Sequence, residues 1–113
     1  RFSTLDFLPP RNIFSGEPLD MDGKHDLHVI TGVVRADSLY DYLRPFATTM
    51  ERTVFADHYR FSAGDIEFIN RLADRGTTII VTEKDASKLV AASTLSPAAR
   101  RQLYSVEVRV RFV

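Results

Sequence analysis

The chain has 113 residues, and its 15 Lys and Arg residues balance its 15 Asp and Glu residues, so the formal net charge is zero. This length suits one domain with a single core, and the charge balance gives no electrostatic reason to expect nucleic acid or an anionic membrane as a partner. The absence of cysteine excludes disulfides and thiolate catalysis, and fits a cytosolic protein. Because the chain begins at Arg1 without an initiator Met, we expect a fragment of a longer protein.

The first 25 residues contain a short strand pattern and then an irregular segment. Residues 1–7 carry alternating apolar side chains and end at a Pro-Pro pair, which is typical of a short strand. Residues 9–24 hold three prolines and two glycines and predict a connector. We therefore expect residues 1–25 to be an inter-domain strand and connector, and residues 26–113 to form one α/β domain.

Strand and helix patterns alternate from residue 26 onward. Residues 27–30 are a short β-branched run before a Thr-Gly turn, which predicts a strand. Apolar residues then recur at helical spacing from residue 39 to residue 50, and Pro45 should kink or end that helix. Residues 52–56 predict a second strand.

The following segments have clear start and stop signals. A Ser-x-x-Asp capping box at Ser62 predicts a helix with an apolar stripe, and Gly76 is suited to end it. Residues 77–81 are continuous and β-branched, as in a strand buried on both faces. Residues 84–92 predict another helix, and a short one should begin after Ser96, with proline at its first position.

The C-terminal segment alternates strictly between apolar and polar residues. Val106, Val108, Val110 and Phe112 share one face, which predicts a strand with one wet face, antiparallel and at an edge of the sheet. Alternating strands and helices imply right-handed crossovers and a mainly parallel sheet. The predicted fold is therefore α/β, a three-layer sandwich with a small central sheet and helices on both faces.

Polar residues follow the three central strands. They are Thr31-Gly32, Asp57-His58 and the segment 82–85. Ligands of open α/β sheets collect outside the carboxyl ends of the strands, and parallel strands end on the same side. We therefore expect all three segments on one rim of the domain.

His58 is the leading catalytic candidate. A histidine has an unperturbed pKa near 6.5 and can accept a proton near neutral pH, and Asp57 could orient it. The alternative interpretation is that Asp57 caps a turn and His58 forms a hydrogen bond within it. The local sequence leaves both interpretations open.

The segment Thr82-Glu83-Lys84-Asp85 has the form of a capping box. Thr82 would be the N-cap and Asp85 its reciprocal partner, and Glu83 would lie in the first turn, where the helix dipole favours negative charge. Lys84 is left over, and is either solvated or reaches an anion at the rim. These four residues are candidates for contacting a substrate.

Other signals for chemistry are weak or missing. His25 and His28 flank Asp26, but a spacing of three does not place two side chains on one face of a strand, so we expect no metal site. The sequence has no P-loop motif, G-x-G-x-x-G, G-x-S-x-G or H-E-x-x-H. We expect this chain by itself to bind no cofactor and to be catalytically inactive.

The order of these segments resembles the C-terminal domain of the tetraacyldisaccharide 4′-kinase family. That family has T-G-I, then F-P-D-H-H, then aromatic-[ST]-x-x-D-[LI], then V-T-E-K-D-A-x-K-L. Here the motifs are T-G-V from Thr31, F-A-D-H-Y from Phe55, F-S-A-G-D-I from Phe61 and V-T-E-K-D-A-S-K-L from Val81. The resemblance extends from about residue 27 to the end, and more weakly over residues 1–7.

The resemblance implies a two-domain kinase at the cytoplasmic face of the bacterial inner membrane. Such a kinase uses ATP and Mg²⁺ to phosphorylate the 4′-hydroxyl of a tetraacylated glucosamine disaccharide 1-phosphate in lipid A synthesis. It implies that the P-loop, the magnesium-binding carboxylates and the membrane-associating segment lie in an N-terminal domain that is missing here. His58 would pair with an aspartate of that domain.

The chain departs from the family pattern at three places around this rim. Ala56 replaces the proline and Tyr59 replaces the second histidine of F-P-D-H-H, and Val34-Arg35 replace the Asn-Pro that usually follows T-G-I. His58, the first histidine of the motif, is retained.

Two other functions remain open from the sequence. A non-catalytic interaction or regulatory module of this shape would come from a parent protein without a P-loop. A stand-alone α/β enzyme would use His58 with Glu83 or Lys84 as acid and base, and the isolated domain would then turn over a substrate.

Overall fold

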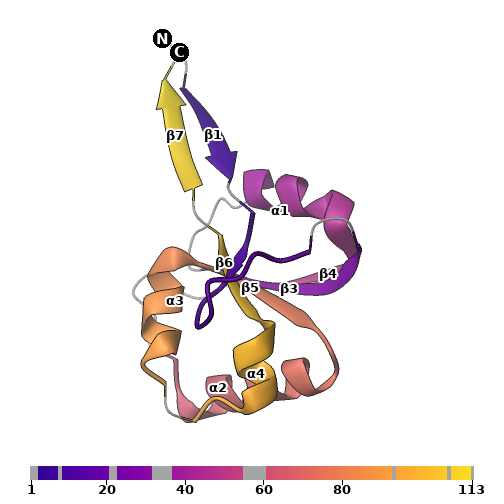
Figure 1. Ribbon diagram of the computed structural model, residues 1–113, viewed down its shortest axis with the longest axis vertical. Coiled ribbons are helices and arrows are strands. Elements are labelled where there is room, and N and C mark those ends of the chain that lie inside the picture. Colours follow the sequence, from indigo (N-terminus) through magenta and orange to yellow (C-terminus); the bar gives the residue numbers. More distant parts are fainter. Residues whose placement is uncertain are drawn as a thin grey trace.

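The computed structural model contains a five-stranded sheet with helices on both faces, and a separate two-stranded ribbon (Figure 1). It describes residues 3–7, 9–20, 23–31, 37–54, 61–92, 94–106 and 108–112. The strands are β1 (Ser3–Phe7), β2 (Arg11–Asn12), β3 (His25–Thr31), β4 (Ala47–Val54), β5 (Thr78–Thr82), β6 (Leu103–Val106) and β7 (Val108–Phe112). The helices are α1 (Asp37–Leu43), α2 (Ala63–Asp74), α3 (Glu83–Val90) and α4 (Pro97–Gln102), with a 3-10 turn η1 (Arg44–Phe46) after α1.

The five-stranded sheet has the order β2-β6-β5-β3-β4. β4, β3, β5 and β6 run parallel, and β2 joins β6 antiparallel at the edge. The connection after β3 leads to β4 on one side, whereas the connection after β5 leads to β6 on the other. β3 and β5 are therefore neighbours whose connections run in opposite directions, which makes the crevice between their carboxyl ends the switch point of the sheet.

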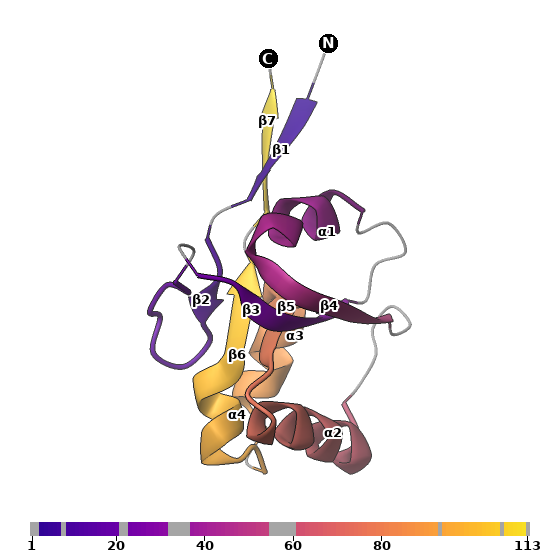
Figure 2. The same cartoon turned by 90° about the vertical axis from the view of Figure 1, so that its right-hand side faces the viewer.

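The core lies on both faces of the sheet, as a three-layer sandwich requires. Successive β5 residues alternate between the two sides: Ile79 and Val81 pack toward α2, α3 and α4, whereas Ile80 packs toward α1. Figure 2 shows α1 on one side of the sheet and the other three helices on the opposite side. All three β5 residues are fully buried. Burial of a large aliphatic side chain contributes about 1.5–3 kcal/mol to stability, so these residues hold the strand in the centre of the sheet. The predicted fold class is confirmed.

The start and end signals of α2 act as the sequence predicted. The Ser62 Oγ atom accepts a hydrogen bond from the Asp65 backbone N–H at 3.2 Å, and the Asp65 carboxylate accepts one from the Ser62 N–H at 2.9 Å. Gly76 follows the helix with a φ of 81°, a left-handed conformation that glycine adopts without steric cost.

The predicted helix over residues 39–50 is wrong in its second half. α1 ends at Leu43, Pro45 lies in η1, and β4 already begins at Ala47, well before the predicted strand start at residue 52. Proline lacks the N–H that the helix interior needs, so it ends the helix although the apolar spacing continues to Met50. The segment instead becomes the edge strand of the sheet.

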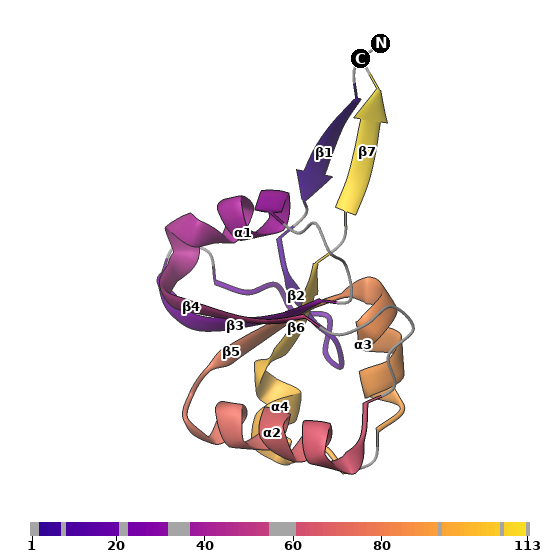
Figure 3. The ribbon, with the colours of Figure 1, turned by 180° about the vertical axis from the view of Figure 1, so that it is seen from behind.

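The C-terminal segment forms two strands rather than one continuous edge strand. β6 runs parallel to β5 inside the sheet, and β2 covers its outer side. β7 leaves the sheet and pairs antiparallel with β1, with Ser3 opposite Phe112 and Phe7 opposite Val108. Figures 1 and 3 show this ribbon projecting away from the body. The edge of the sheet is formed by β2, in which Arg11 and Asn12 pair with Ser105 and Tyr104 of β6.

The segment predicted to be a connector contributes a buried anchor. The Asn12 side chain is buried and donates to the carbonyl oxygens of Arg100 and Arg101 at the end of α4, at 2.8 and 3.3 Å. Its Oδ1 atom accepts from the backbone N–H groups of Phe14 and Ser15. The loop after β2 is therefore fastened to α4 and to β6.

Candidate functional site

The carboxyl ends of the four parallel strands lie level along one edge of the sheet. Thr31 at the end of β3 pairs with Val54 at the end of β4, and Thr82 at the end of β5 pairs with Val106 of β6. These strands therefore end on the same side of the sheet. Asp57, His58 and Gly32 themselves lie outside the described residues.

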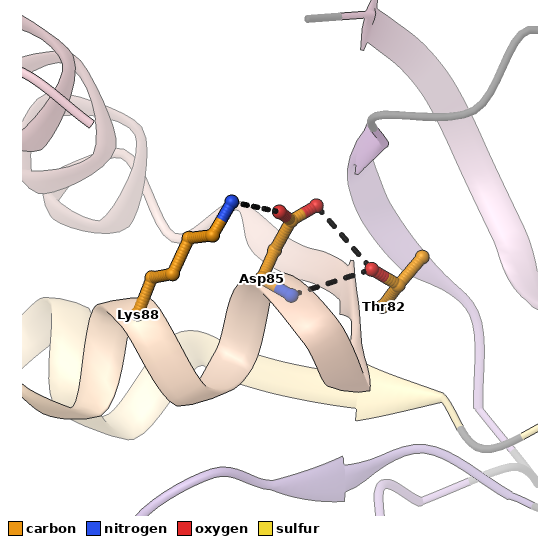
Figure 4. Close-up of polar contacts among 3 residues, drawn as sticks. All are labelled: Thr82, Asp85 and Lys88. Atoms are coloured by element: carbon orange, nitrogen blue, oxygen red, sulfur yellow. Dashed lines mark hydrogen bonds and ion pairs between the residues drawn. The ribbon is translucent and has the colours of Figure 1, made fainter. Parts of the chain in front are cut away.

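The Thr82 to Asp85 segment begins α3 next to the switch point. The Asp85 backbone N–H donates to Thr82 Oγ1 at 3.5 Å, so Thr82 is the N-cap that the sequence predicted. The Thr82 hydroxyl lies 3.3 Å from Asp85 Oδ2, so the carboxylate contacts the capping hydroxyl itself. On its other side, Asp85 Oδ1 lies 3.8 Å from the Lys88 ammonium group (Figure 4). Asp85 thus links the end of β5 to the second turn of α3.

Burial separates the residues of this segment by role. Asp85 is only 7% exposed, and a buried carboxylate needs the hydroxyl and the cation that it contacts here. Glu83 is exposed in the first turn of α3. The Lys84 side chain lies outside the described residues. Thr82 and Asp85 therefore hold the turn in place, which leaves Glu83 as the described member of the segment that is open to a ligand.

The two histidines of the H-D-L-H segment make separate contacts. His25 Nε2 lies 2.6 Å from the Asp20 carbonyl oxygen, whereas His28 is buried with Nε2 2.6 Å from Thr53 Oγ1 and its ring edge-on to Phe68. In the part of the chain that the structure describes, no group of three or more His, Cys, Asp and Glu residues could hold a metal ion.

His28 is an unusual group for the interior of a sheet. Burial lowers its pKa most strongly, the Glu51 carboxylate raises it, and the Arg75 guanidinium lowers it further. Its Nδ1 atom is buried and makes no hydrogen bond within the described structure. A proton on Nδ1 would therefore lack an acceptor, which favours the neutral ring.

A pocket of about 460 Å³ lies between the start of α2 and the end of α3. Its lining includes Phe61, Ser62, Ile66, Lys88, Ala92 and Thr94. The sequence did not predict it, because its walls come from two helices whose packing is not a local property. The only sequence signal was that both flanking segments carry motifs of the resemblance noted above.

None of the described helices is long and apolar enough to cross a bilayer.

Comparison with known proteins identifies the family. The model of the tetraacyldisaccharide-1-P 4′-kinase family matches residues 6–113. A tetraacyldisaccharide 4′-kinase of Phocaeicola vulgatus is 30% identical in an alignment of 106 positions, which covers 90% of this chain and 28% of that protein. A protein of the same name from Xanthomonas axonopodis is 28% identical, and the match covers 94% of this chain and 28% of that protein. Another from Methylobacterium nodulans is 36% identical, and the match covers 58% of this chain and 20% of that protein.

Two further results set the scope of the match. The chain spans little more than a quarter of the length of the first two of these relatives. Comparison with solved structures gives no significant match. Because the family model matches nearly the whole chain, including the D-H and T-E-K-D segments, this chain belongs to the tetraacyldisaccharide-1-phosphate 4′-kinase family.

Proposed function

We propose that this chain is the C-terminal domain of a kinase that phosphorylates the 4′-hydroxyl of a tetraacyl-glucosamine disaccharide 1-phosphate in lipid A synthesis. The observation that carries the proposal is the family match over residues 6–113. The relatives bear the name of this kinase and are more than three times longer than the matched region, which supports a further domain elsewhere in the protein. The chain alone would be inactive.

The proposed division of the chain places residues 1–25 between the two domains and residues 26–113 in the C-terminal domain. The ribbon supports this arrangement, because β1 and β7 pair with each other outside the five-stranded sheet. A domain joined at the outer end of this ribbon would be held by two paired strands. β2 and Asn12, in contrast, pack on the body of the domain.

We assign the proton-accepting role to His58, with Asp57 as its orienting partner. The assignment is supported by β4, which ends at Val54, shortly before the D-H motif in the sequence, on the side of the sheet where ligands of α/β sheets collect. Phosphoryl transfer depends mainly on in-line positioning and charge stabilisation, and a base near the attacking hydroxyl adds a smaller contribution. Pairing of His58 with an aspartate of the other domain would form the base only when the domains close.

The family is a kinase family and so uses a nucleotide; ATP with Mg²⁺ is our specific proposal. The sequence carries no P-loop, and the described residues contain no cluster of carboxylates suited to a divalent ion. The described residues therefore do not fit a nucleotide–magnesium site, and we assign that site to the N-terminal domain.

The remaining contacts proposed for the rim are with the lipid substrate. Glu83 and Lys84 would face it directly, whereas Thr82 and Asp85 would fix the turn from which they project. We further propose that the full protein is peripheral at the cytoplasmic face of the inner membrane, with membrane contact through the N-terminal domain.

The test starts with the coding sequence upstream of Arg1, which should contain a P-loop motif after a predicted strand. In the full-length protein, His58→Ala should lower kcat by roughly 10²–10⁴, the usual contribution of a general base, in an assay of phosphate transfer to the lipid disaccharide. His25→Ala, at the opposite end of β3 from the rim, is the matched control and should change kcat less than about threefold. An equally small effect of His58→Ala would reject the assignment, and a parent gene without a P-loop would favour a non-catalytic module.

A further inference from the structure

The pocket between α2 and α3 has the size and lining of a small-molecule site. Its volume of about 460 Å³ lies within the range of roughly 300–1,000 Å³ that is common for ligand pockets. Figure 3 shows the two helices on the same side of the sheet. Phe61 and Ile66 contribute apolar surface from the beginning of α2, and Ala92 does so from the end of α3. Such a wall suits a ligand with a compact apolar body.

The lining of this pocket includes one cation, which could contact an anion. Among the described residues that line it, Lys88 is the one with a charged side chain. Its ammonium group lies 3.8 Å from the Asp85 carboxylate, and the Thr82 hydroxyl contacts the other oxygen of Asp85 (Figure 4). An ammonium group forms its strongest hydrogen bonds with phosphate or carboxylate oxygens.

Two segments distant in sequence meet at this pocket. Phe61 and Ser62 belong to the F-S-A-G-D-I segment that starts α2, and Lys88 belongs to the V-T-E-K-D-A-S-K-L segment that forms α3. Capping explains Ser62, Thr82 and Asp85 in these segments. It does not explain Phe61, which lines the pocket; Lys88 also lines the pocket, and it forms the ion pair with Asp85.

We propose that this pocket binds a small amphipathic anion. The apolar body would lie against Phe61 and Ile66, and its phosphate or carboxylate would contact Lys88. This binding needs only the present chain, so it can be tested separately from the kinase function.

The test is an NMR titration of the ¹⁵N-labelled 113-residue chain, which has its own core on both faces of the sheet. The ligands are octyl phosphate, octanoate and 1-octanol, each kept below the concentration at which it aggregates. The amides of Phe61, Ile66 and Ala92 should shift, and at least one anion should bind about tenfold more tightly than octanol because of the charge-assisted contact. The tighter of the two anions identifies the headgroup.

Four variants separate the contributions. Lys88→Met should remove the advantage of the anions over octanol, Lys88→Arg should retain it, and Lys24→Met, at an exposed lysine elsewhere, should leave all three affinities unchanged. Ala91→Leu, at an exposed position in the pocket wall, should weaken all three ligands. Shifts that are absent or that lie away from the pocket would overturn the proposal. Equal affinity of the natural chain for octanol and for the anions would also overturn it. So would a Lys88→Met variant that still binds the anions more tightly than octanol while its β3 and β5 amide shifts show that the fold is preserved.

Discussion

At the scale of single residues, His28 shows how a polar group can stay neutral inside a sheet. It is 4% exposed, its Nε2 atom contacts the Thr53 hydroxyl, and its ring packs against Phe68 of α2. Charging the ring would bury a cation beside an Nδ1 atom that has no acceptor in the described structure. Glu51 is the acidic group that favours the charged form, and Arg75 opposes it. The balance lies with the neutral ring.

This balance predicts a loss of stability on the acid side. Because burial lowers the pKa of His28 in the folded state, the unfolded chain binds a proton more readily. The His28 contribution is therefore fully present above the unfolded pKa of about 6.5 and is lost as the pH falls from there through the lowered folded pKa. Between neutral and mildly acid pH, the free energy of unfolding measured with urea should fall more steeply for the natural chain than for His28→Gln. His25→Gln, at a half-buried position, is the control, and its free energy of unfolding should fall as steeply as that of the natural chain. If the plots of unfolding free energy against pH were parallel for the natural chain and His28→Gln, the prediction would be wrong.

At the scale of secondary-structure elements, two similar caps differ in what they hold. Ser62 starts α2 with a capping box whose hydrogen bonds are exposed to solvent. The hydroxyl of each cap also contacts the carboxylate three residues later, but the contact of Ser62 with Asp65 is exposed to solvent, whereas Asp85, which contacts Thr82 at the start of α3, is buried. Removing the first hydroxyl costs a helix cap, whereas removing the second also takes a partner from a buried charge.

We therefore expect Thr82→Ala to destabilise the chain more than Ser62→Ala. Loss of an N-cap costs about 1 kcal/mol, and leaving a buried acceptor with fewer partners adds roughly 1–3 kcal/mol. Thr82→Ser keeps the hydroxyl and should recover most of the difference. Free energies of unfolding from urea titrations measure all three variants. If Ser62→Ala cost as much as Thr82→Ala, the Asp85 contact would contribute nothing beyond capping.

At the scale of the whole molecule, sequence patterns predicted what depends on neighbours along the chain. The N-caps Ser62 and Thr82 and the buried strand β5 follow from local spacing and were predicted correctly. Asp85, predicted as the reciprocal partner of Thr82, contacts the Thr82 hydroxyl instead of its backbone N–H. The division of the C-terminal segment between β6 and β7 was not predictable, because both strands look alike in sequence and take partners from the other end of the chain. The α2–α3 pocket was missed for the same reason. His58 was singled out from its motif, and its catalytic role remains a proposal.

The same long-range pairing yields a prediction about truncation. Removing residues 1–8 deletes β1, which pairs only with β7 in the described sheets, so the five-stranded sheet should keep its stability. Removing residues 1–14 also deletes β2 and Asn12, which leaves two carbonyl oxygens at the end of α4 without the Asn12 donor and exposes the outer side of β6. Losing that buried donor should cost roughly 1–3 kcal/mol.

Urea unfolding of the two truncated chains decides between two boundaries for the domain. A small change for the first and a large change for the second would show that the stable domain begins near β2, so that only β1 acts as a link to the rest of the protein. Asn12→Ala in the intact chain is the matched variant, because it removes the same side-chain donor and leaves the backbone pairing of β2. Equal stability of the two truncated chains would instead favour residues 1–25 as a connector throughout, with the domain beginning at residue 26.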